Sequence, residues 1–195
     1  HRIAYLVREY EISPFNILAM TFTNKAAREM RERLDRLVGS RSDALTVGTF
    51  HSFCAKVLRI DGYNLGLDTN YSIYDADDQA KIIKDSMELA EIDPKRNPPR
   101  AILSMISNAK NKMWDSRAFT KNADNYFEEI CAQVYHHYEE ALTRNNAVDF
   151  DDLLMKTVQL LREFPGVRTK YNDRYQHIMV DEFQDTNISQ YQLAR

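Results

Sequence analysis

Glycine and proline are scarce in this sequence, with five of each among 195 residues. Both residues interrupt regular structure, so their scarcity predicts a helix-rich protein with few tight turns. The only cysteines, Cys54 and Cys131, are far apart, which indicates neither a disulfide framework nor a zinc knuckle. No apolar run approaches the roughly 18–20 residues of a membrane span, and no signal-peptide pattern is present. We therefore expect a cytoplasmic protein with no membrane partner.

The charge of the chain is nearly balanced, because 26 basic and 29 acidic side chains leave a net charge of −3. This excludes a uniformly basic nucleic-acid coat, and a hydrophobic content of 44% predicts a folded chain. The charge is unevenly distributed: residues 1–60 carry ten basic and six acidic side chains, a net of +4. A polyanion would meet this first third most readily. The alternative is chance clustering on a solvated surface.

The first sixty residues alternate between strand and helix patterns. Residues 16–22 form a short apolar run that is typical of a strand buried on both faces. A helix capped by Thr23 or Asn24 follows and ends at Gly39. A second strand is expected at 45–47, with a helix from residue 49 to about residue 60. Alternation of this kind predicts a parallel α/β sheet.

The middle of the chain is different, because residues 70–146 offer no buried strand pattern beyond 71–74. Three helices are predicted there, beginning near Asp75, Pro98 and Asn125. We therefore expect a helical unit inserted into the α/β domain. After it, one helix is expected over 150–164, closed by Pro165-Gly166, and a short buried strand over 177–180.

Two carboxylates, Asp181 and Glu182, directly follow the last predicted strand. Parallel α/β sheets bind ligands at the carboxyl ends of their strands. One carboxylate there could hold a magnesium ion while the other acts as a base toward water, and phosphoryl transfer requires both. The alternative is that both are simply polar residues at the end of a strand.

Polar and aromatic residues also follow the first two strands. Backbone N–H groups and short side chains at the start of a helix suit a phosphate oxygen, and Phe22 offers a ring on which an unpaired base could stack. Thr49 and His51 could donate to phosphate at the next strand end. The alternatives are helix capping by the polar residues and core packing by Phe22.

Three close carboxylates, Asp149, Asp151 and Asp152, could suggest a metal cluster. An acidic first helical turn capped by Asp149 is the simpler interpretation. None of the five glycines lies in a phosphate-binding loop that ends in Lys and Ser or Thr.

Four segments resemble ordered motifs of the UvrD/Rep/PcrA helicases, the 3′-to-5′ branch of superfamily 1. Residues 19–30 (AMTFTNKAAREM) are similar to motif Ia, and residues 48–53 (GTFHSF) to motif Ib. Residues 149–153 (DFDDL) resemble motif Ic, and residues 180–187 (VDEFQDTN) resemble motif II. The likeness extends over essentially the whole chain.

The resemblance implies a fold and a set of roles. It implies a partial RecA-like domain 1A over 1–68 and 147–195, with an inserted helical domain 1B over 69–146. Asp181 would hold Mg²⁺, Glu182 would activate the attacking water, and Gln184 would sense the terminal phosphate of ATP. Single-stranded DNA, including single/double-strand junctions, would contact Thr21, Phe22, Thr23, Asn24, Thr49 and His51. No definite role follows for the 149–153 segment.

The resemblance also implies what this chain does not carry. The family's Walker A loop lies just before the segment that begins at His1, and its second motor domain and arginine finger come later. We therefore expect part of a helicase that does not hydrolyse ATP alone, with the start of 1A and domains 2A and 2B as its partners. Two other classes stay open: a non-catalytic nucleic-acid or protein-binding module, and a metal-dependent nuclease using Asp149, Asp151, Asp181 and Glu182.

Overall fold

The computed structural model describes residues 1–195 as a helix-rich α/β protein with two small parallel sheets. Its larger sheet has the order β2-β1-β5, and its smaller sheet pairs β3 with β4. The strands are β1 (Ile17–Thr21), β2 (Thr46–Thr49), β3 (Ser72–Ile73), β4 (Ala147–Val148) and β5 (His177–Val180). The helices before β4 are α1 (Arg2–Arg8), α2 (Asn24–Val38), α3 (Phe50–Asp61), α4 (Ala76–Leu89), α5 (Pro99–Asn111), α6 (Ser116–Lys121) and α7 (Tyr126–Arg144). Those after it are α8 (Phe150–Glu163), α9 (Pro165–Arg174) and α10 (Ile188–Ala194).

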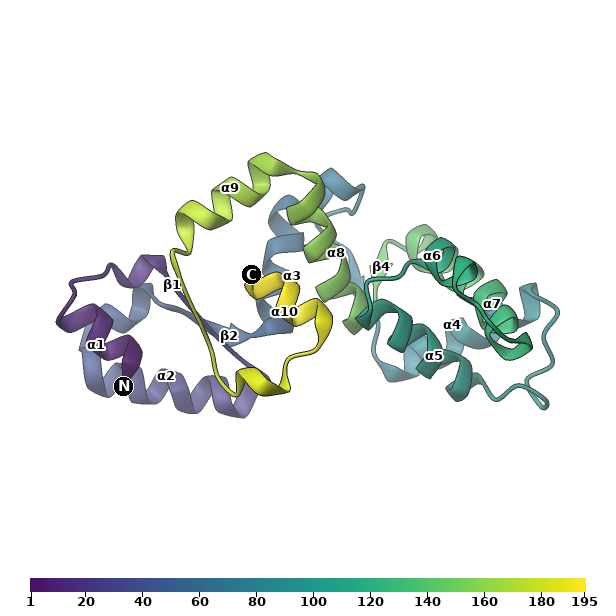
Figure 1. Cartoon of the computed structure of the whole chain (residues 1–195), viewed down its shortest axis with the longest axis horizontal. Coiled ribbons are helices and arrows are strands. Elements are labelled where there is room, and N and C mark those ends of the chain that lie inside the picture. The colour runs from purple at the N-terminus through teal and green to yellow at the C-terminus, as the bar shows by residue number, and fades with distance from the viewer.

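The central strand β1 is buried along its whole length. Its side chains alternate between two hydrophobic cores, as the period of a strand requires. Ile17 and Ala19 pack with α1 and α2, whereas Leu18 and Met20 pack with α3 and α8. Helices therefore cover both faces of the sheet, as Figure 1 shows. The predicted buried strand and its parallel partners are confirmed.

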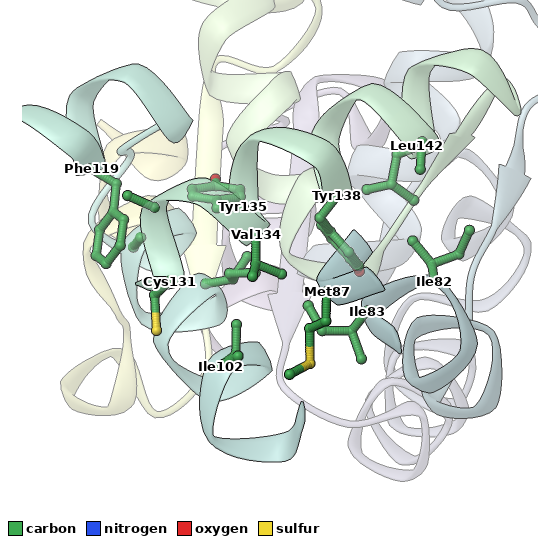
Figure 2. Close-up of a cluster of buried hydrophobic side chains, with 14 of the residues drawn as sticks. Ile82, Ile83, Met87, Ile102, Phe119, Cys131, Val134, Tyr135, Tyr138 and Leu142 are labelled. Carbon is green, nitrogen blue, oxygen red and sulfur yellow. The ribbon is translucent and has the colours of Figure 1, made fainter. Parts of the chain in front are cut away.

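The helical unit α4–α7 lies on the other side of α8 from the larger sheet and has a core of its own (Figure 1). Figure 2 shows side chains of α4, α5, α6 and α7 converging on this core, with Tyr135 and Tyr138 fully buried in it. The three predicted helix starts are confirmed: Asp75 and Asn125 cap α4 and α7 with their side chains, and Pro99 begins α5.

Several expectations were incomplete or wrong. The strand at 177–180 is not fully buried, because β5 is an edge strand and Ile178 is 39% exposed. Pro165 does end α8, but it also begins α9, since proline is well tolerated in the first turn of a helix. The sequence reasoning missed the short helix α6 and the two-residue strand β4.

One buried ion cluster joins the helical unit to the rest of the chain. The Lys110 ammonium at the end of α5 lies 2.7 Å from Asp149 and 2.9 Å from Asp152, and none of its side chain is exposed. The Tyr138 hydroxyl of α7 donates to the same Asp149 oxygen that Lys110 contacts, at 3.0 Å. Three helices, α5, α7 and α8, therefore meet at one charged centre.

The carboxylates keep Lys110 charged despite its burial. Burial alone disfavours the ammonium, but the nearby Asp152 and Asp149 outweigh it and raise the pKa of Lys110. Burial would raise the pKa of Asp152 too, yet the Lys110 charge holds it below its ordinary value. The pKa of Asp149 is raised by burial and by the Asp152 charge. Without the ammonium, two carboxylates would be buried side by side.

We therefore expect Lys110→Met to destabilise the chain by about 3–5 kcal/mol, the cost of breaking a buried ion pair from one side. Urea unfolding of the chain measures this. Lys84→Met is the matched control, because Lys84 is exposed on α4 and its change should stay within about 0.5 kcal/mol. Equal stability of the two variants would contradict the structural role of Lys110.

Candidate functional site

The three strands of the larger sheet end side by side. Thr21 of β1 pairs with Thr49 of β2, and the Asp181 amide donates to the Met20 carbonyl at 3.0 Å. Because all three strands are parallel, the residues that follow them share one edge of the sheet. The candidate residues from three distant parts of the sequence are thus brought together at this edge.

Asp181 and Glu182 are both exposed at the end of β5. Glu182 has a left-handed backbone (φ 51°, ψ 48°), which is uncommon for a residue with a side chain and often marks a functional position. The Gln184 amide donates to the Glu182 carboxylate at 2.5 Å. The structure therefore places Glu182 and Gln184 in direct contact at the short 3-10 helix Phe183–Asp185, of which Glu182 is the N-cap residue.

Asp181 also lines a hollow of about 390 Å³ between β5, α1 and α2. Arg2 and Arg33 line the same hollow, together with Glu29. An exposed carboxylate suits Mg²⁺, which prefers oxygen ligands and keeps several of its waters. The residues present thus fit part of a magnesium site, and the two arginines add positive charge to the lining of the hollow.

The residues after β1 are partly used within the protein. The Thr23 hydroxyl caps α2 by accepting from the Ala26 amide at 3.1 Å. Thr21 is buried, and its hydroxyl donates to the Thr23 carbonyl. Phe22 is half-buried against Phe50, with ring centroids 5.5 Å apart. Capping by Thr23 is confirmed, and Phe22 remains partly exposed.

The residues after β2 show a similar division. Thr49 is buried and caps α3 by accepting from the Ser52 amide at 3.1 Å. His51 is half-buried and meets the Phe150 ring edge-on, with centroids 5.8 Å apart. Burial lowers the pKa of His51, although the Asp151 carboxylate opposes this. Burial therefore favours the neutral form of the His51 imidazole.

The acidic segment before α8 is a helix cap. Asp149 accepts from the Asp152 amide at 2.8 Å and Asp152 accepts from the Asp149 amide, which forms a capping box. No three His, Cys, Asp or Glu side chains are grouped so that they could hold a metal ion. The capping interpretation is confirmed, and the four-carboxylate metal cluster of a nuclease finds no support.

Sequence reasoning missed Lys110, the partner of these carboxylates. Lys110 lies 39 residues before Asp149. The only signal in the sequence is that Lys110 follows the apolar positions of α5 on the same face, after Ile102 and Ile106. A lysine at such a position is usually assigned to the surface.

The UvrD/REP helicase N-terminal domain family matches residues 1–195, the whole chain. The chain belongs to this family. Relatives carry the name ATP-dependent DNA helicase PcrA: those of Bacillus subtilis and Staphylococcus aureus are 45% identical over all 195 residues, and that of Staphylococcus epidermidis is 44% identical. Membership in the UvrD/REP family confirms the predicted resemblance to the UvrD/Rep/PcrA helicases.

The chain spans only about a quarter of the length of these relatives: 26% of the Bacillus subtilis protein and 27% of the Staphylococcus aureus protein. In the structure no helix is both long and apolar enough to cross a membrane.

The Thr23 cap makes a prediction that is independent of any ligand. Thr23→Ala should lower the free energy of unfolding by about 1 kcal/mol, because the Ala26 amide loses its partner. Thr23→Ser keeps the hydroxyl and should be nearly neutral. Urea unfolding of the chain without DNA compares them, and an equal loss in both variants would show that the hydroxyl does not carry the effect.

Proposed function

We propose that this chain is part of an ATP-dependent 3′-to-5′ DNA helicase that translocates on single-stranded DNA, and that it carries motifs Ia, Ib, Ic and II. The observation that carries the proposal is the meeting of three strand ends at one sheet edge, within a chain that belongs to the UvrD/REP family. Carboxylates follow one strand, and aromatic and polar groups follow the other two. One edge thus offers groups for both phosphate chemistry and a nucleic-acid strand.

The division into domains is part of the proposal. Residues 1–68 and 147–195 would form a partial RecA-like domain 1A, and 69–146 the inserted domain 1B. The separate hydrophobic core of α4–α7 supports this division. The start of 1A and domains 2A and 2B of the longer protein would be partners, together with single/double-strand junctions. A cytoplasmic location stays a prediction.

In the proposed mechanism, Asp181 and the hollow beside it would hold Mg²⁺ and the phosphates of ATP. The ion would neutralise charge that develops on the phosphates during transfer. Glu182 would orient and deprotonate the attacking water, and Gln184 would contact the terminal phosphate. The bond between the Gln184 amide and Glu182 supports a shared role for the two side chains. Since no glycine-rich phosphate loop occurs among the 195 residues, this chain alone should not turn over ATP.

For DNA, the accessible groups at the edge are Phe22, Thr23, Asn24 and His51. Thr21 and Thr49 are buried, so their proposed contribution is to shape the two helix starts beside the strand. The His51 imidazole would donate an N–H to a phosphate or base. A non-catalytic binding module with the same fold is the second candidate, and the next experiment separates the two.

In the longer protein that carries this chain, Glu182→Gln should preserve ATP binding and nearly abolish hydrolysis, because Asp181 remains while the base is lost. Steady-state ATPase assays with single-stranded DNA and a nucleotide-binding titration measure the two effects. Glu163→Gln, at the exposed end of α8, is the matched control. Near-normal hydrolysis by Glu182→Gln would refute the assignment, and an inactive wild-type protein would favour the binding module.

In the longer protein that carries this chain, Phe22→Ala should weaken binding of an oligothymidylate by roughly 1–3 kcal/mol if a base stacks on the ring. Fluorescence anisotropy at a fixed salt concentration measures this affinity, and thermal unfolding provides the second readout. Phe183→Ala is a control for an aromatic residue at the same sheet edge, since its ring is 49% exposed but follows β5. A loss of stability with unchanged affinity would make Phe22 a core residue only.

A further inference from the structure

A chain of amide hydrogen bonds connects the turn after β5 to the start of α8. The Asn187 side-chain amide donates to the Asn111 side-chain oxygen at 2.5 Å. The Asn111 amide in turn donates to the Asp151 carboxylate at 3.2 Å and to the Ser107 carbonyl at 2.8 Å. Three segments that are far apart in sequence therefore meet at one residue of α5.

The partners of Asn111 fix the orientation of its side chain. Its oxygen faces a donor, and its two N–H groups face acceptors, so a flipped amide would lose all three hydrogen bonds. The Asn187 side chain is held in the same way. Its oxygen accepts from the Gln190 backbone amide and from the Ser189 hydroxyl, each at 2.9 Å. Such networks hold their members in one arrangement.

The turn that carries Glu182 and Gln184 is thus fastened at both ends. At its beginning, the Asp181 amide is bonded to the Met20 carbonyl of β1. At its end, Asn187 caps α10 and is bonded to Asn111. Between these points, residues 182–185 are exposed and only Thr186 is half-buried, so burial does little to hold this turn in place.

The other end of the network lies beside the proposed DNA-facing group. Asp151 is next to Phe150, whose ring contacts His51. Burial lowers the pKa of His51, and the charge of the Asp151 carboxylate partly opposes this. Asn111 is therefore hydrogen-bonded to Asn187, at the end of the turn with the proposed catalytic groups, and also to Asp151, the carboxylate near His51.

We propose that Asn111 is a positioning residue. It holds the Glu182–Gln184 turn in place, and through Asp151 it links that turn to the DNA strand that His51 would contact. The helical unit would thereby take part in coupling DNA to ATP hydrolysis. The anchoring of the turn stands on geometry alone, whereas the coupling rests on the proposed function.

Hydrogen exchange on the full chain tests the anchoring without any ligand. Asn111→Ala should speed exchange of the Asp185 and Thr186 amides about fivefold, as expected for the loss of one restraining hydrogen bond. Asn108→Ala is the matched control, because Asn108 is an exposed residue of the same helix. Equal exchange in the two variants would overturn the proposal.

A second variant separates anchoring from coupling. Asn111→Asp keeps an oxygen that accepts from Asn187 but places a carboxylate against Asp151. The turn should then exchange as slowly as in the wild type. Oligothymidylate binding should slow exchange in the turn in the wild type and in Asn108→Ala, but not in Asn111→Asp. Slowing that persists in Asn111→Asp would refute the link through Asp151.

In the longer protein, the ratio of kcat with DNA to kcat without DNA should fall about fivefold in Asn111→Asp, with KM for ATP unchanged. A merely structural role would lower the amount of folded protein and leave this ratio as it was, which would count against the proposal. A chain that binds no oligothymidylate would defeat the proposed function, while the exchange measured without DNA would still decide whether Asn111 anchors the turn.

Discussion

The hydrogen-bond ladder on the two sides of β1 is the constraint on which the candidate site depends. Parallel pairing with β2 and β5 leaves no freedom in where the three strands end relative to one another. A shift of one residue in either ladder would turn the side chains of one strand to the opposite face of the sheet and would disrupt both cores. The same apolar side chains that stabilise the sheet therefore set the positions of Asp181, Phe22 and His51.

The helical unit is attached by interactions of a different kind. Apolar packing is non-directional and tolerates small displacements, whereas the Lys110 ammonium must reach two carboxylates at once. Its burial makes any displacement of α5 along α8 costly. Asn111 is the next residue along the chain. The position of α5 against α8 therefore also sets where Asn111 meets Asp151 and Asn187. The alignment of α5 with the start of α8 therefore depends on one buried charge.

Local signals made much of this structure predictable. β1 is a compact apolar run, and the caps at Thr23, Asp75 and Asn125 act within four residues of sequence. The carboxylates after β5 were also found from sequence, because strand and acidic pair are adjacent. Two features depend on distant partners instead. β4 has only two residues and exists because β3 pairs with it, and Asn111 acquires its role from a residue 76 positions away. Periodicity and propensity carry no information about such pairs.

The smaller sheet holds the two ends of the helical unit together. The Ser72 amide donates to the Asn146 carbonyl and the Tyr74 amide to the Val148 carbonyl, so the chain enters and leaves the helical unit at neighbouring points. A segment whose two ends already touch imposes almost no closure cost on the host fold. Between these ends, helices could be lengthened, shortened or exchanged with little strain on the strands. The β3–β4 pair is thus a position at which the helical unit could be replaced by one of different length.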